Sequence, residues 1–255
     1  MEENLKNKLL NKKEVGWKNL DTREKEAIFS FSNGYIKFLN NSKTEREAVH
    51  SAKEIAVANG FRDISTVDTL NPGDKVFFIN RDKSMYLAVI GTEKLENGLQ
   101  IVGAHVDSPR LDLKPNPLYE DGGFAYFKTH YYGGIKKYQW TTIPLSIHGV
   151  MVKANGEKVY LNIGEDENDP IFTITDLLPH LAQMDKKLRN AIDGENLNLL
   201  IGSIPMDGEK EADAVKLNIM NILNQKYGVT ESDFVSSEIE LVPSFKARSL
   251  GFDGS

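Results

Sequence analysis

His105 and Asp107 are the two residues whose types and spacing best suit chemistry in this sequence. They follow the run Leu99–Ala104, which has strand character. Residues i and i+2 of an extended chain point to the same side, and open α/β sheets place their sites at strand carboxyl ends. By itself the pattern leaves two interpretations. One is a metal ligand with an orienting carboxylate, and the other is a structural histidine bonded to backbone.

Other segments that resemble functional motifs have simpler explanations. Ser108 lacks the Gly-x-Ser-x-Gly context of a nucleophile. The pairs Gly122-Gly123 and Gly133-Gly134 lack the strand–GxGxxG–helix context of dinucleotide binding. The acidic run Gly164–Asp169 lacks EF-hand spacing and is expected to be a solvated loop, with a lid or an assembly contact as alternatives.

The four remaining histidines are assigned mainly to structural roles. His148 alternates with apolar residues and is expected within a sheet, and His50 is expected to face solvent from a helix. His180 is expected at the surface or in the core of a helix. His130 is either a half-buried strand residue or a residue that reaches an active site, including that of a neighbouring subunit.

The composition limits the possible partners and metals. The formal charge is −6, from 37 acidic and 31 basic residues, and no basic stripe occurs. Such a surface repels phosphate backbones, so nucleic-acid binding is not expected. The chain has no cysteine, so any metal is held by His, Asp and Glu, which suits zinc, cobalt or manganese.

The sequence shows no sign of membrane targeting. Met1–Glu14 is charged and lacks the apolar core of a secretory signal. No run of 18 apolar residues occurs, so no membrane span is expected. We expect a cytoplasmic location.

Helices precede strands in the first part of the chain. Asp21 with Glu24 and Thr44 with Glu47 are capping-box signals. They predict helices over 22–39 and from Thr44 to a stop at Gly60. Short β-branched or aromatic runs predict strands at Val76–Ile79, Tyr86–Ile90 and Leu99–Ala104, in a mixed sheet.

The pattern becomes rich in strands after Pro115. Asn116-Pro117 and Asp121-Gly122-Gly123 are interpreted as breakers, with a domain boundary near residue 114. The predicted strands are Phe124–His130, Thr142–Lys153, Lys158–Ile163 and Glu238–Val242, and the predicted helices are Thr175–Asn190 and Glu211–Tyr227.

Three long segments carry a resemblance to a known family. The segments are Gly103–Pro115, Thr129–Trp140 followed by Ile143–Leu145, and Glu240–Arg248. They resemble M18 aminopeptidases, the group of aspartyl aminopeptidase and yeast vacuolar aminopeptidase I. Together they spread the resemblance over essentially the whole chain.

The resemblance implies a zinc ligand at His105 and an orienting carboxylate at Asp107. It implies two zinc ions per active site, with cobalt or manganese as alternatives, and removal of amino-terminal residues from peptides by a zinc-activated water. The family's other ligands and its general base follow the Phe245–Arg248 segment, so they are expected beyond Ser255. We therefore expect the amino-terminal half of the enzyme, inactive by itself.

The fold that the resemblance implies is α/β, a mixed-sheet catalytic domain interrupted by a β-rich insertion. Residues 1–113 begin the catalytic domain, 114–244 form the insertion and 245–255 return to the catalytic domain. Peptide substrates and a large homo-oligomer are implied. A non-catalytic module that acts through the insertion's assembly surface is the alternative. A deacylase or carboxypeptidase is a third, which the Tyr131–Gly134 segment argues against.

An aromatic cluster lies within the expected insertion, at Tyr131, Tyr132, Tyr138 and Trp140. Tyr and Trp are enriched where proteins contact one another. We expect part of this cluster at a subunit interface, so that Trp140→Ala or Tyr132→Ala weakens association more than fold stability.

Overall fold

The structure is a computed structural model that describes residues 9–10, 15–177, 192–209 and 212–254. The chain divides into two units, which we describe separately. One unit combines the segments Met1–Asn41 and Ala247–Ser255, and the other is Ser42–Lys246. Among the described residues, no helix has the length and apolar character needed to cross a membrane.

The first unit is built on helix α2 (Thr22–Asn40), which confirms the helix predicted over 22–39. The Asp21 side chain accepts a hydrogen bond from the Glu24 backbone N–H, and the Glu24 carboxylate accepts one from the Asp21 N–H. At the other end of the helix, the Ala247 N–H donates to Asn40 Oδ1 at 2.6 Å. Side-chain capping therefore sets where this helix begins.

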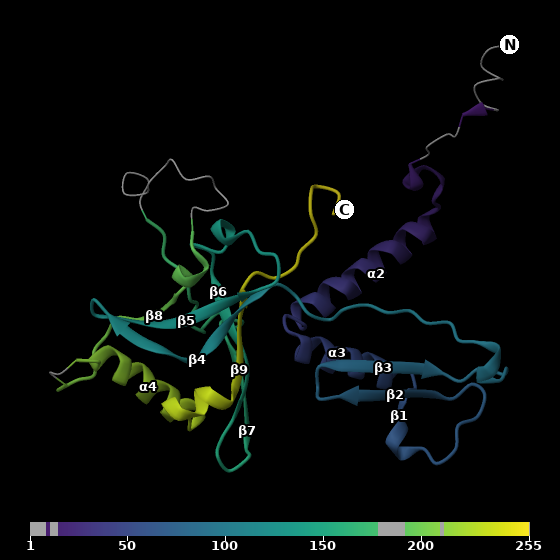
Figure 1. The fold of residues 1–255 in the computed structure, drawn as a ribbon. Coiled ribbons are helices and arrows are strands. Elements are labelled where there is room, and N and C mark those ends of the chain that lie inside the picture. Colours follow the sequence, from purple (N-terminus) through teal and green to yellow (C-terminus); the bar gives the residue numbers. More distant parts are fainter. Residues whose placement is uncertain (1–8, 11–14, 178–191, 210–211, 255) are drawn as a thin grey trace. The chain divides into compact units, whose positions relative to one another are not determined.

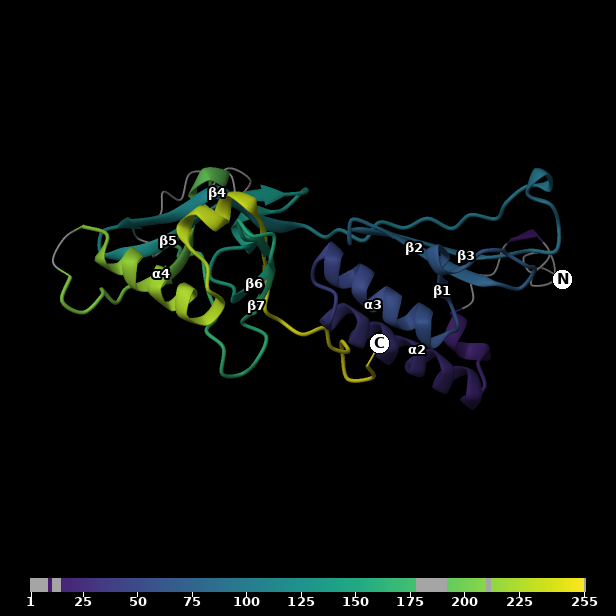
Figure 2. The same cartoon turned by 90° about the horizontal axis from the view of Figure 1, so that it is seen from below.

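The second unit starts with helix α3 (Glu45–Ala58), which Thr44 and Glu47 cap as predicted. Helix α3 packs against a small mixed sheet (Figures 1 and 2). Within that sheet β1 (Arg62–Asp63) is parallel to β2 (Lys75–Asn80), and β2 is antiparallel to β3 (Ser84–Val89). A helix layered on a mixed sheet confirms the predicted α/β class.

A six-stranded antiparallel sheet forms the rest of this unit, in the order β7-β6-β9-β4-β5-β8. Helix α4 (Ala214–Tyr227) lies beside β4, β5 and β8 (Figure 1). Gly228 ends the helix in a left-handed conformation. The strands are β4 (Arg110–Asp121), β5 (Phe124–Tyr132), β6 (Leu145–Val152), β7 (Lys158–Ile163), β8 (Leu199–Gly202) and β9 (Ser237–Pro243).

The strand register gives this sheet one apolar face and one polar face. One row of paired residues crosses it as Leu111, Leu241, Ile147 and Ile163. The next row crosses as His130, Asp112, Glu240, His148 and Asn162. Successive residues of a strand point to opposite faces, so the first row belongs to the core and the second faces away from it.

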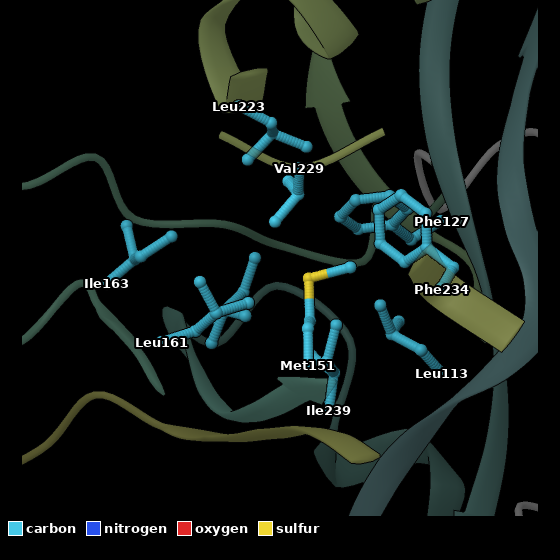
Figure 3. Close-up of a pocket in the computed structure, with 10 residues that line it drawn as sticks. Leu113, Phe127, Met151, Leu161, Ile163, Leu223, Val229, Phe234 and Ile239 are labelled. Carbon is cyan, nitrogen blue, oxygen red and sulfur yellow. The ribbon is translucent and has the colours of Figure 1, made fainter. Parts of the chain in front are cut away.

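The core on the apolar face contains a small cavity of about 20 Å³ (Figure 3). Its lining is entirely apolar, and cavities of this kind stay empty of water. The cavity is therefore a gap in packing. It is lined by Leu113, Phe127, Ile147, Met151, Leu161, Ile163, Leu223, Val229, Phe234 and Ile239.

The prediction that Asn116-Pro117 interrupts regular structure is wrong, because strand β4 continues through these two residues. The register between β4 and β5 shifts between Leu113 and Leu118. Proline has no N–H to donate, and a bulge removes the need for that donor. The expected boundary at residue 114 lies inside this strand. Gly122 and Gly123, both at positive φ, form the turn to β5, as the breaker there predicts.

Other differences concern strands and one aromatic side chain. The predicted strand Leu99–Ala104 is absent, since none of the described strands pairs with it. Strands β1, β4 and β8 were not predicted. The predicted helix Thr175–Asn190 lies almost wholly outside the described residues. Trp140 is buried in the core, so the prediction that it serves an interface is wrong.

Candidate metal-binding site

His105 and Asp107 lie in the extended segment between β3 and β4. The residues before them are exposed, with Val102 at 99%. The predicted buried strand therefore does not present them here. Their side chains are also accessible, at 83% exposure for His105 and 37% for Asp107.

The structure nevertheless brings the two side chains together as predicted. His105 Nδ1 lies 2.9 Å from the Asp107 carbonyl oxygen and 3.2 Å from Asp107 Oδ1. The Asp107 carbonyl oxygen and the Oδ1 of an ionised Asp107 can only accept hydrogen bonds, so in these contacts Nδ1 carries the proton. The lone pair of a neutral His105 is then on Nε2, which is the arrangement that a metal-binding histidine needs.

Tyr132 completes the surroundings of Asp107. Its hydroxyl donates to Asp107 Oδ2 at 2.9 Å. This hydrogen bond is the main reason that the pKa of Asp107 lies below its ordinary value. The same bond raises the pKa of the Tyr132 hydroxyl. Sequence reasoning missed this contact, although Tyr132 belongs to the aromatic cluster that it singled out.

Arg110 connects Tyr132 to a buried group of charges. Its guanidinium carbon lies 4.1 Å from the centre of the Tyr132 ring. Its Nη1 lies 2.9 Å from Glu45 Oε1, and its Nε lies 2.7 Å from Asp112 Oδ1 and 3.6 Å from Glu240 Oε2. Burial opposes the charge of Arg110, but Asp112 and the other carboxylates keep its pKa above the ordinary value.

Glu240 is the most deeply buried carboxyl group of this cluster, at 2% exposure. Burial, together with the charge of Glu45, raises its pKa to about 8. A neutral Glu240 lets the cluster hold Arg110 without an excess of buried negative charge.

The other predicted histidine positions have different outcomes. His148 lies in β6 and His50 is exposed on α3, as predicted. His130 lies on β5 as predicted, but it is exposed instead of half-buried and stacks on Tyr131. His180 lies outside the described residues.

The acidic run also differs from expectation at one residue. Asp166, Glu167 and Asn168 are exposed, as a solvated loop requires. Glu165 is only partly exposed, and Lys43 and Ser146 donate to its Oε1 at 2.6 and 2.7 Å. Partners from distant segments hold Glu165, and this could not be inferred from the run itself.

The fit of a metal depends on the donors that the site offers. His105 provides one neutral imidazole nitrogen, and Asp107 provides the carboxylate behind it. Among the described residues, no group of three or more His, Cys, Asp or Glu side chains could hold a metal ion. The two residues therefore fit one part of a zinc site and do not form a complete one.

The sequence matches a family profile described as Aminopeptidase I zinc metalloprotease (M18) over residues 38–255. A protein of Clostridium acetobutylicum named "Probable M18 family aminopeptidase 1" is 50% identical over 255 residues, which cover 98% of this chain and 55% of that protein. A Thermotoga maritima protein of the same name is 50% identical over 235 residues, which cover 91% of this chain and 51% of that protein.

Solved structures agree. The M18-family aminopeptidase of Thermotoga maritima has a TM-score of 0.90 at 46% identity, over 96% of this chain and 54% of that one. Aminopeptidase I of Clostridium acetobutylicum has a TM-score of 0.88 at 47% identity, over 97% and 56%. The structure of the yeast mApe1 dodecamer has a TM-score of 0.64 at 18% identity, a similarity that concerns the fold and nothing further.

These matches confirm the resemblance and the predicted fold class. The chain spans about half the length of the curated relatives it matches. The profile covers well over half of the chain itself. The chain therefore belongs to the aminopeptidase I zinc metalloprotease (M18) family.

Proposed function

We propose that this chain supplies one part of the metal site of an aminopeptidase, which removes amino-terminal residues from peptides. The observation that carries the proposal is the contact of His105 Nδ1 with Asp107. That contact places the proton on Nδ1 and leaves Nε2, on an exposed side chain, free to bind a cation.

In this proposal His105 holds a zinc ion through Nε2, and Asp107 keeps the imidazole in the correct tautomer and orientation. Zinc, when bound, polarises the substrate carbonyl and lowers the pKa of water. Asp107 contributes by accepting the Nδ1 proton in a hydrogen bond, which makes Nε2 a stronger donor to the metal.

In this proposal the remaining metal ligands and the general base lie outside this chain. A dinuclear site needs further ligands and a general base, and we place them in the half of the relatives' length that this chain does not span. Imidazole and carboxylate ligands also accept cobalt and manganese, so either metal could replace zinc. A cytoplasmic location belongs to the same proposal.

The test uses the complete peptidase assembly, with peptidase activity and bound zinc as separate measurements. His105→Ala is expected to abolish activity and to reduce bound zinc. Asp107→Asn is expected to retain part of the metal and to lose about 10–100-fold in affinity or rate. His50→Ala is the matched control, because His50 is 72% exposed on α3 and pairs only with Glu54 among the described residues. Normal zinc and activity in His105→Ala would overturn the proposal.

We also propose that copies of the chain associate. Tyr131 and Tyr132 are 38% and 40% exposed at the end of β5, where aromatic side chains favour protein contacts. The rival function, a non-catalytic module, would use the same surface. Sedimentation of the chain at micromolar concentration tests association, and a clean monomer would contradict it. Activity of the complete assembly distinguishes the enzyme from the module.

A further inference from the structure

The two carboxylate oxygens of Asp107 have different partners. Oδ1 lies 3.2 Å from His105 Nδ1, whereas Oδ2 accepts a hydrogen bond from the Tyr132 hydroxyl at 2.9 Å. Tyr132 is the last residue of β5, 25 positions further along the chain. Tyr132, a residue of the six-stranded sheet, therefore holds Oδ2 of Asp107, the residue whose Oδ1 contacts His105.

Arg110 holds the Tyr132 ring in place. Arg110 and Tyr132 are directly opposite one another in the β4–β5 ladder, and the guanidinium lies 4.1 Å from the ring centre. A cation over an aromatic face is an attractive arrangement. Strand pairing with Arg110 therefore fixes the backbone of Tyr132, and the Arg110 guanidinium packs against the Tyr132 ring.

The guanidinium itself has little freedom. The Arg110 side chain is 6% exposed, and the carboxyl groups of Glu45, Asp112 and Glu240 surround it. Planar guanidinium groups lose little entropy for each contact they form. The chain of contacts thus runs from a buried ion cluster, through Tyr132, to the exposed Asp107.

We propose that Tyr132 is a positioning residue for the candidate metal ligand His105, acting through Asp107, and that Arg110 sets the position of its ring. The proposal rests on the proposed function. An exposed carboxylate rotates freely in water, and a rotated Asp107 offers its oxygens to solvent instead of to Nδ1. By engaging Oδ2, the Tyr132 hydroxyl keeps Oδ1 directed at His105.

The first measurement needs neither zinc nor turnover. The metal-free 255-residue chain, labelled with ¹⁵N in histidine, is examined by NMR above about pH 8, where an ordinary imidazole is neutral. The His105 signals are assigned by their loss in His105→Ala. The wild-type chain is expected to carry the His105 proton mainly on Nδ1. Tyr132→Phe, which keeps the ring over Arg110, is expected to raise the fraction of His105 with the proton on Nε2, because only the Asp107 carbonyl oxygen, at 2.9 Å from Nδ1, is then still held in place.

Two further variants separate positioning from general disturbance. Tyr131→Phe is the matched control, because the described contacts of Tyr131 with His130 and Lys137 use its ring, which Phe retains. It is expected to leave the His105 signals unchanged. Arg110→Lys keeps the charge but loses the planar face, so a smaller shift in the direction of Tyr132→Phe is expected.

The second measurement uses zinc in the complete peptidase. In competition with a chelator, Tyr132→Phe is expected to hold zinc up to about tenfold more weakly than wild type, less than direct loss of the orienting carboxylate. Unchanged His105 signals in Tyr132→Phe, or an equal change in Tyr131→Phe, would overturn the role of Tyr132. Undiminished zinc in His105→Ala would overturn the proposed function instead, so the two failures are distinguishable.

Discussion

His148 Nδ1 lies 2.6 Å from Glu47 Oε1, and this contact joins strand β6 to the first turn of helix α3. The other ring nitrogen, Nε2, lies 3.0 Å from Glu165 Oε1. The His148 side chain is only 3% exposed. A buried imidazole between two carboxylates therefore connects three segments that are far apart in the sequence.

Removal of this imidazole is expected to destabilise the fold. In His148→Ala, Glu47 and Glu165 each lose a partner in a poorly solvated place, and we expect the free energy of unfolding to fall by roughly 3 kcal/mol. Urea denaturation measures the change. His50→Ala, on the exposed side of α3, is expected to cost less than about 0.5 kcal/mol. Equal losses in the two variants would show that the connection adds no stability.

Glu240 is expected to make stability depend on pH. Its pKa is about 8 in the folded chain, because it is buried beside Glu45, against an ordinary value of 4.5. The proton favours the folded state, so this contribution is complete below about pH 4.5 and is lost as the pH rises to about 8. The loss approaches about 1.4 kcal/mol per pH unit within that window.

Glu240→Gln provides the measurement for this effect, since the amide stays neutral. Denaturation at pH 5, 7 and 9 should show the variant gaining on wild type as the pH rises. Glu45, Arg110 and Asp112 lie beside Glu240, His148 pairs with it across the sheet, and all four are the same in the variant and in wild type. Glu231→Gln, whose side chain is 49% exposed, should show no such trend. A constant difference between Glu240→Gln and wild type would contradict the raised pKa.

Trp140 is expected to affect stability, which reverses the prediction from sequence. Its side chain lies in the main core, at 9% exposure. Truncation to alanine leaves a cavity, so Trp140→Ala is expected to lower the free energy of unfolding by about 3–5 kcal/mol. Trp17→Ala is the control, because Trp17 is 44% exposed and contacts Phe29 across 5.9 Å. A Trp140→Ala chain as stable as Trp17→Ala would place Trp140 outside the core.

The 255-residue chain alone is expected to hydrolyse no aminoacyl-anilide above background. The reason is the absence, among the described residues, of any group of three ligands for a metal. Added zinc or cobalt should make no difference. The matched measurement is the complete peptidase assembly under the same conditions, which should be active. If the isolated chain did turn over substrate and a chelator abolished that turnover, the proposal that the remaining metal ligands lie outside this chain would be wrong.

The sequence alone predicted features that depend on neighbouring residues. Asp21 with Glu24 and Thr44 with Glu47 are three positions apart, so each cap forms as soon as its helix starts. His105 and Asp107 are two positions apart and meet in the same way, even though the predicted strand before them does not form. The family could also be recognised from the sequence, because three long segments of this chain resemble M18 aminopeptidases.

The tertiary structure decided what depends on pairing between distant segments. Tyr132 meets Asp107 only because β5 folds back beside β4, and no pattern in the aromatic cluster specifies that partner. Glu240, Asp112 and His148 share a row only because the register of three strands aligns them. A shift of register by one residue would move each side chain to the other face. Register is fixed by the packing of the whole sheet, so these contacts could not be predicted from local sequence.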